Sequence, residues 1–93
     1  MRLEWSRAAD ADIFRIWRFN AERNVDLADR IEQRLHGAAA LIRSCPRIGR
    51  PVAGEELREL SVPDVQSRIT YRLEAERILI VRILHARESR DAS

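Results

Sequence analysis

The chain begins with alternating charged and apolar residues and then changes to a helical period. Arg2–Trp5 alternates strictly, which predicts a short β-strand. Ser6 can then cap a helix, because its hydroxyl accepts a hydrogen bond from a free amide of the first turn. Asp10 and Asp12 lie in the early turns, where carboxylates stabilise the positive end of the helix dipole. Apolar residues at helical spacing predict a helix to about residue 23: Ala9, Ile13, Ile16 and Trp17.

A second helix follows after a short break. Asn24 can cap it, and the helix is expected to end before Cys45 and Pro46. Its apolar stripe consists of Ala28, Ile31, Leu35, Ala38 and Ile42. Because only a few residues separate the two helices, they should lie antiparallel as a helical hairpin.

The rest of the chain changes to the period of β-strands. The segment Pro46–Gly54 holds two prolines and two glycines and is expected to be a loop. The expected strands are Leu57–Val62, Arg68–Glu74 and Ile78–Ala86. The order β-α-α-β-β-β predicts an α+β fold, with the hairpin packed on one face of a small, mainly antiparallel sheet. We expect a single domain over residues 1–87 and a polar tail over 88–93.

Strand alternation predicts which side chains share a face of this sheet. The face toward the helices should hold Ile69, Tyr71, Leu73, Leu79, Val81 and Ile83. The opposite face should hold Arg68, Arg72, Arg82, Ile78, Ile80 and Leu84, with Arg58 alongside. An arginine within a central strand is unexpected for a core, since burying a guanidinium without a partner costs several kcal/mol. Arg82 therefore either pairs with a residue such as Glu59 or Glu74, or binds a partner protein.

Composition narrows the possible chemistry. Net charge is +2, and all 17 basic residues are arginine, so no lysine is available as an acid, base or Schiff-base nucleophile. Guanidinium groups suit bidentate contacts to carboxylate or phosphate. The single cysteine, Cys45, cannot form an internal disulfide and has no accompanying metal-ligand pattern, so no metal or cofactor is expected. No run is long enough to span a membrane and no signal-peptide pattern is present, which predicts a cytoplasmic protein.

Four segments in order give the chain a resemblance to the ParE/RelE superfamily of toxins. They are Pro46-Arg47-Ile48-Gly49-Arg50-Pro51, Arg58-Glu59-Leu60, Tyr71-Arg72 and Ile83-Leu84-His85-Ala86-Arg87. The helical positions fit the same spacing: Asp12, Ile13, Ile16, Trp17, Ala28, Ile31 and Leu35. The resemblance covers about residues 1–87. One departure is Asn24-Val25, where many relatives carry Asn-Pro between the helices.

The resemblance implies a partner and two possible targets. The partner would be a cognate antitoxin, of the ribbon-helix-helix type, whose acidic amphipathic C-terminal segment folds on binding to form a hetero-oligomer. ParE-like members inhibit DNA gyrase and need no catalytic site, whereas RelE-like members cleave mRNA on the ribosome. The residues expected to bind target or antitoxin are Arg58, Arg68, Arg72, Ile80, Arg82 and Arg87.

The choice between binder and enzyme depends on acid–base groups. A nuclease would use Arg58, Arg82, His85 and Arg87. RelE-like nucleases commonly carry lysines in the central loop and a tyrosine or second histidine near the C-terminus, and this chain has neither. The other histidine, His36, lies mid-helix and is expected to be a surface or packing residue. The sequence therefore favours gyrase inhibition over ribosome-dependent mRNA cleavage, with a non-toxic scaffold or adaptor domain as the third reading.

Overall fold

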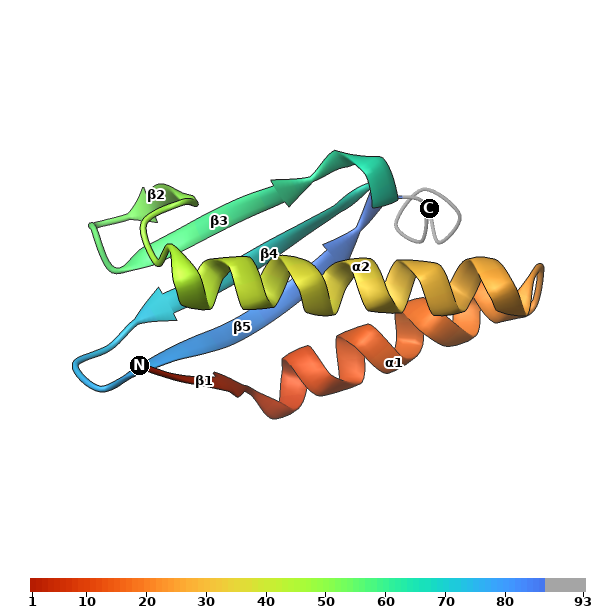
Figure 1. Ribbon diagram of the computed structural model, residues 1–93, viewed down its shortest axis with the longest axis horizontal. Helices are drawn as coiled ribbons and strands as arrows, with labels where there is room; N and C mark the ends of the chain where they lie inside the picture. The colour runs from red at the N-terminus through yellow and green to blue at the C-terminus, as the bar shows by residue number, and fades with distance from the viewer. Residues whose placement is uncertain (87–93) are drawn as a thin grey trace.

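The structure is a computed structural model that describes residues 1–86, so Arg87 and the tail expected at 88–93 lie outside the described residues. Two helices and five strands make up the fold, which confirms the α+β prediction (Figure 1). The elements are β1 (Arg2–Trp5), α1 (Arg7–Ala21), α2 (Val25–Ser44), β2 (Arg50–Ala53), β3 (Leu57–Val62), the 3-10 turn η1 (Pro63–Val65), β4 (Ser67–Leu73) and β5 (Arg77–His85).

One strand lies in a segment where the sequence predicts none. The segment predicted as loop contains β2, which pairs antiparallel with β3 at the edge of the sheet. Pro51 lies within it, and proline is tolerated in an edge strand because one side of that strand needs no ladder donor. All four residues of β2 are exposed, so no apolar alternation was present to reveal it.

The sheet has the strand order β1-β5-β4-β3-β2. β1 pairs in parallel with β5, and the remaining pairs are antiparallel. β5 is therefore an interior strand, between β1 and β4. β1 accompanies only its first half, because the parallel register ends where Trp5 pairs with Ile80. The second half of β5 is left without a strand partner on that side.

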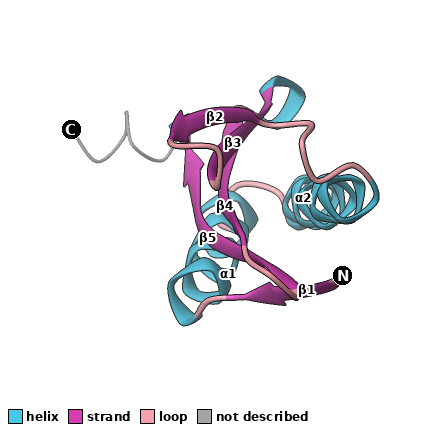
Figure 2. Ribbon diagram, turned by 90° about the vertical axis from the view of Figure 1, so that its left-hand side faces the viewer, coloured by secondary structure: helices cyan, strands magenta, loops and turns pink. Residues whose placement is uncertain are grey.

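The two helices form the predicted antiparallel hairpin and cover different parts of the sheet. Ser6 and Asn24 cap them as expected, since their side chains accept from the amides of Ala9 and Leu27. α2 lies across one face of the sheet, hereafter the inner face (Figure 2). α1 contacts α2 and β5. The Trp17 indole joins the helices by donating to Asp29 at 2.8 Å.

A β-bulge in β5 corrects the predicted faces. Tyr71 pairs with Ile80, but its neighbour Thr70 pairs with Arg82, so Val81 is an extra residue in the ladder. Alternation therefore changes phase at Val81. Ile78 and Ile80 are fully buried in the core. The prediction that Ile78 and Ile80 lie on the open face was therefore wrong. The placing of Leu79 and Val81 toward the helices was also wrong, since Leu79 pairs with the exposed Arg72, Val81 is the bulged residue, and both are only half-buried.

The other inner-face predictions are confirmed on the far side of the bulge and on β4. Ile69, Tyr71 and Ile83 are buried within the core. The core otherwise joins the apolar stripes of both helices to β3 and β5: Ala9, Ile13, Ile16, Ile31, Leu35, Ala38, Ala39, Ile42, Val62, Ile78 and Ile80. Burying such side chains contributes roughly 1.5–3 kcal/mol each, which makes this layer the main source of stability.

Candidate functional site

The side of the sheet facing away from α2, hereafter the outer face, carries arginines among aliphatic side chains. Cross-strand pairing defines its members on β3, β4 and β5: Leu57, Glu59, Ser61, Arg68, Thr70, Arg72, Leu79, Arg82 and Leu84. Arg68, Arg72 and Arg82 are exposed, as predicted, and Leu84 is 45% exposed. Such a mixture of guanidinium and apolar surface suits a protein segment that is both acidic and amphipathic.

One carboxylate lies at the centre of this face. Glu59 contacts Arg50 at 3.1 Å and Arg68 at 3.8 Å. Arg72 has no hydrogen bond or ion pair with any of the described residues. The outer face therefore keeps an excess of positive charge after its internal ion pairs are counted.

A hollow extends the outer face where β4 begins. It measures about 470 Å³ and is lined by Ser61, Pro63, Gln66, Ser67, Arg68, Leu84 and Ala86. Gln66 turns the chain there with a left-handed φ of 52°. The hollow thus combines the cation of Arg68 with the exposed aliphatic group of Leu84, which are paired across the strands.

The ion-pair partner of Arg82 is Asp12, which differs from both expected partners. Its Nε and Nη2 atoms donate to the two oxygens of Asp12, at 2.8 and 3.0 Å. The expected partners, Glu59 and Glu74, instead contact Arg50 and Arg77. The Arg82 side chain nevertheless remains 60% exposed. Arg82 is therefore paired within the fold and is still accessible to a partner.

Asp12 itself is buried and fully engaged, rather than a surface charge at the helix start. Its carboxylate also accepts the Ile83 amide at 2.8 Å and Arg15 Nη2 at 3.0 Å. Burial raises the pKa of Asp12, but the hydrogen bonds from Arg82, Ile83 and Arg15 outweigh it and the net pKa is lowered. One signal was available in the sequence, because Asp12 lies on the same helical face as Ala9 and Ile16.

Arg58 does not lie on the outer face, contrary to the prediction. It pairs with Tyr71 across the strands, points to the inner side and is 5% exposed. Its guanidinium donates to the carbonyls of Glu55, Arg47 and Gly49 and to the Glu55 carboxylate. Arg58 thus holds the loop before β2 and the turn after it.

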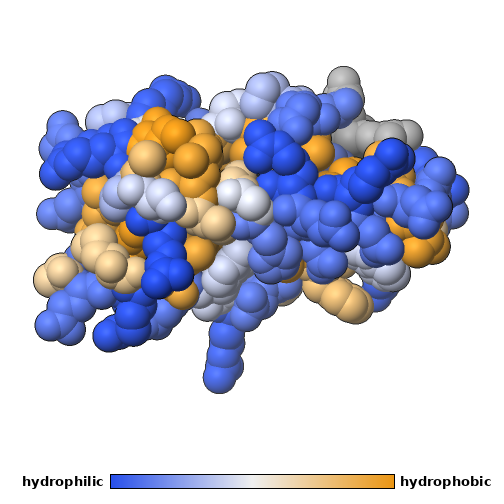
Figure 3. Space-filling view, in the orientation of Figure 1, coloured by the Kyte–Doolittle hydropathy of each residue, from blue (hydrophilic) through white to orange (hydrophobic). Residues whose placement is uncertain are grey.

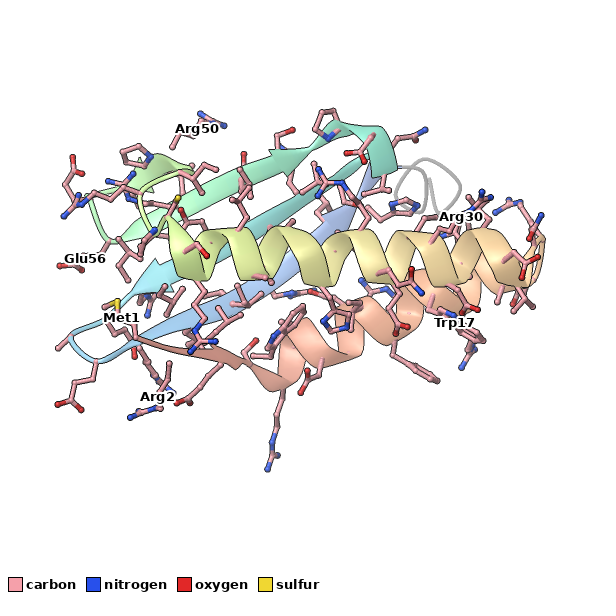
Figure 4. The ribbon with its side chains drawn as sticks, in the orientation of Figure 1. Met1, Arg2, Trp17, Arg30, Arg50 and Glu56 are labelled. Atoms are coloured by element: carbon pink, nitrogen blue, oxygen red, sulfur yellow. The ribbon has the colours of Figure 1, made fainter. Side chains whose placement is uncertain are left out.

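His85 is also buried, at 3% exposure, and contacts the Ser67 hydroxyl at 3.0 Å. Its other ring nitrogen lies 3.5 Å from the Asn20 amide nitrogen. The Asn20 Oδ1 atom is buried without a hydrogen-bond partner. Both residues line a pocket of about 340 Å³ between the helices and η1, together with Leu27, Arg30, Ile31, Arg34, Asp64, Val65 and Gln66. Among these lining residues, Arg30 projects from α2 and is labelled in Figure 4.

The four residues considered for a nuclease do not meet in one place. Arg58 pairs with Tyr71 and His85 with Ser67, which puts them four residues apart along β4, roughly 13 Å at about 3.3 Å per residue. Arg82 lies on the opposite face of the sheet, and Arg87 lies outside the described residues. His36 is exposed and its ring lies 5.2 Å from that of Trp5, so it packs as expected.

Two features are absent from the described residues. Within residues 1–86, no three His, Cys, Asp or Glu side chains gather closely enough to hold a metal ion. No helix of the described part is long and apolar enough to cross a membrane.

Solved structures with the same fold give its class. The chain matches a structure titled "Chromosomal ParDE TA system from P. aeruginosa" with a TM-score of 0.83 and 23% identity, covering 91% of this chain and 95% of that one. It matches the isolated E. coli RelE toxin with a TM-score of 0.55 and 12% identity, covering 98% and 94%. The fold is therefore that of ParE/RelE toxins.

The sequence gives the more specific result. The model of the ParE toxin of the type II toxin–antitoxin system parDE matches residues 3–90. The chain belongs to this family of type II toxins. A search of curated protein sequences gives no match.

Proposed function

We propose that the chain is a toxin that inhibits DNA gyrase by binding it, without catalytic chemistry of its own, in the cytoplasm. Membership of the ParE toxin family supports the toxin class. The observation that favours binding over cleavage is the separation of the nuclease candidates, since Arg58 and His85 are buried and hydrogen-bonded in different regions. General acid–base catalysis needs its groups within hydrogen-bond reach of one substrate.

The proposed partner is a cognate antitoxin with an acidic, amphipathic C-terminal segment attached to a ribbon-helix-helix domain. The outer face supports this partner because it combines exposed guanidinium groups with the exposed Leu84. An extended or helical segment with alternating carboxylates and aliphatic groups would complement both. Arg68, Arg72 and Arg82 are the proposed contact residues among those described.

The test is induction of the chain in bacterial cells, followed by assays with purified protein. We expect filamentation with an SOS response in cells, and accumulation of cleaved or non-supercoiled DNA when the protein is added to gyrase. Co-expression of the antitoxin encoded beside the gene should restore growth. Rapid mRNA cleavage at ribosomal A-sites without an SOS response would instead indicate a RelE-like nuclease. No growth effect and no antitoxin binding would indicate a scaffold domain.

A further inference from the structure

Within residues 1–86, one edge of the Arg82 guanidinium has no partner. An arginine side chain carries five N–H donors in a planar fork. Two of them, on Nε and Nη2, are bound to Asp12. Arg82 has no second partner within residues 1–86. The edge formed by Nη1 and the outer N–H of Nη2 therefore remains for another acceptor, on a side chain that is 60% exposed.

The edge of Arg82 formed by Nε and Nη2 is bound to Asp12, which is itself held in place. Asp12 is 1% exposed and is held in turn by the Ile83 amide and Arg15. Because both oxygens of this carboxylate bind Arg82, the guanidinium plane is oriented before any partner arrives. Such pre-organisation reduces the entropy lost when a long side chain is immobilised on binding. Asp12 thus holds the Arg82 guanidinium in one orientation, whereas an unpaired surface arginine has no such support.

We propose that the free edge of Arg82 binds a carboxylate of the antitoxin's acidic segment, and that Asp12 is its positioning residue. This inference rests on the proposed function. A carboxylate fits the planar fork in bidentate fashion.

The surroundings favour an acidic peptide over nucleic acid. Thr70 pairs with Arg82, and Arg68 with Leu84 lies further along the same face. None of the outer-face residues defined above is aromatic, whereas single-stranded nucleic acid is commonly held by stacking on aromatic rings. An aliphatic group beside a cation instead suits a peptide with alternating acidic and apolar side chains.

The experiment measures the affinity of the folded toxin for its cognate antitoxin by calorimetry. Arg82→Lys keeps the charge but removes the planar fork, and Asp12→Asn keeps an acceptor for the Ile83 amide but removes the anion. We expect each to weaken binding at least about 10-fold, as for loss of a charge-assisted bidentate contact. The double variant should be no weaker than the weaker single variant, because both act on one contact.

The matched control is Arg2→Gln, which removes one charge from an exposed arginine on β1 (labelled in Figure 4) and should change affinity less than about 2-fold. A second readout separates positioning from stability. The Nε–H resonance of Arg82 should shift in Asp12→Asn while the backbone amide spectrum remains that of a folded protein. If Asp12→Asn does not fold, Arg82→Lys alone still tests the site.

Failure of this inference can be told apart from failure of the proposed function. If the wild-type protein binds no antitoxin, the proposed function fails. If it binds tightly and both variants bind within 2-fold of it, the inference about Arg82 and Asp12 is overturned. The inference also fails if Arg82→Lys weakens binding of a DNA or RNA oligonucleotide while antitoxin affinity is unchanged.

Discussion

Individual residues of this toxin carry roles that their chemical type alone would not reveal. Tyr71 is fully buried, yet its hydroxyl donates to the Pro46 carbonyl at 2.7 Å and accepts from the Gly49 amide at 2.8 Å. A Cβ atom at Gly49 would lie 2.7 Å from that hydroxyl and 2.9 Å from the Glu59 carbonyl. Glycine is therefore required in the loop before β2 because the tyrosine and the backbone of β3 leave no room.

The glycines provide a matched pair of variants. Gly49→Ala should lower the free energy of unfolding by about 1–3 kcal/mol, the usual cost of overpacking a tight site. Gly37→Ala should raise it by roughly 0.5–1 kcal/mol, because Gly37 lies inside α2 with nothing within 4 Å of the added methyl group. Thermal and urea unfolding of both variants measures the difference. Equal effects of the same sign would contradict the packing described.

Arg58 and Arg72 provide a second pair, in which two arginines on neighbouring strands should respond differently. Arg58→Ala leaves the carbonyls of Arg47 and Gly49 without their donor, and should destabilise the fold by about 2–3 kcal/mol. Arg72→Ala removes an exposed side chain and should change stability by less than about 0.5 kcal/mol. Urea unfolding checks both values. A larger loss in Arg72→Ala would mean that the roles are reversed.

At the scale of elements, the second half of β5 is the least protected part of the sheet. β1 ends opposite Ile80, so the amide of Ile83 would face outward without a strand partner. Asp12 of α1 accepts this amide and so closes the edge. Native sheets commonly cover or charge such edges to prevent pairing with other chains. The ion pair with Arg82 completes the closure on the outer side.

Low pH should weaken the contribution of Asp12 to the stability of this edge. The pKa of Asp12 lies below its ordinary value, so its ionised form stabilises the folded state above about pH 4, and this contribution is lost as pH falls through the lowered pKa. Asp12→Asn should therefore be less stable than wild type at pH 7, with the gap narrowing below about pH 4. Melting temperatures from pH 7 to pH 2 give this comparison. The lowered pKa of Glu4 affects both proteins and cancels in the difference. A constant gap would show that the charge of Asp12 contributes nothing.

The bulge in β5 marks the limit of prediction from sequence. Alternation correctly placed Ile69, Tyr71 and Ile83, which lie on one side of the shift or on β4. It failed for Ile80, since an extra residue in a ladder leaves no mark in a run of aliphatic residues. Arg58 was misplaced for a related reason, because its neighbours do not reveal that carbonyls of a distant loop surround its guanidinium. The spacing of apolar residues predicted the helices and most strands. Strand pairing and loop contacts determined where the candidate site residues lie.

At the scale of the whole molecule, charge is distributed unevenly although the net value is only +2. Hydrophilic side chains dominate the visible surface in Figure 3, with an apolar area over the end of α2 near β2. Many cations are paired locally, as in Arg34 with Asp64 and Arg77 with Glu4. The outer face keeps Arg68, Arg72 and Arg82 exposed against the single carboxylate of Glu59. The molecule therefore presents a local positive field that its formal charge conceals.

This distribution predicts how salt affects association with an acidic antitoxin. Attraction between exposed charges accelerates the encounter of two proteins, and salt at 0.1 M screens this attraction over about 10 Å. The dissociation rate depends mainly on contacts that have already formed. The association rate constant should fall about 10-fold or more between 20 mM and 500 mM NaCl, with little change in dissociation. The double variant Arg68→Gln/Arg72→Gln should associate more slowly at low salt, and its association rate should depend less on salt. The control double variant Arg2→Gln/Arg43→Gln removes the same amount of charge elsewhere on the molecule. It should keep most of the salt dependence of the wild-type association rate. Stopped-flow fluorescence measures these rates. If both double variants lose the dependence equally, the net charge of the chain guides the partner and the outer face does not.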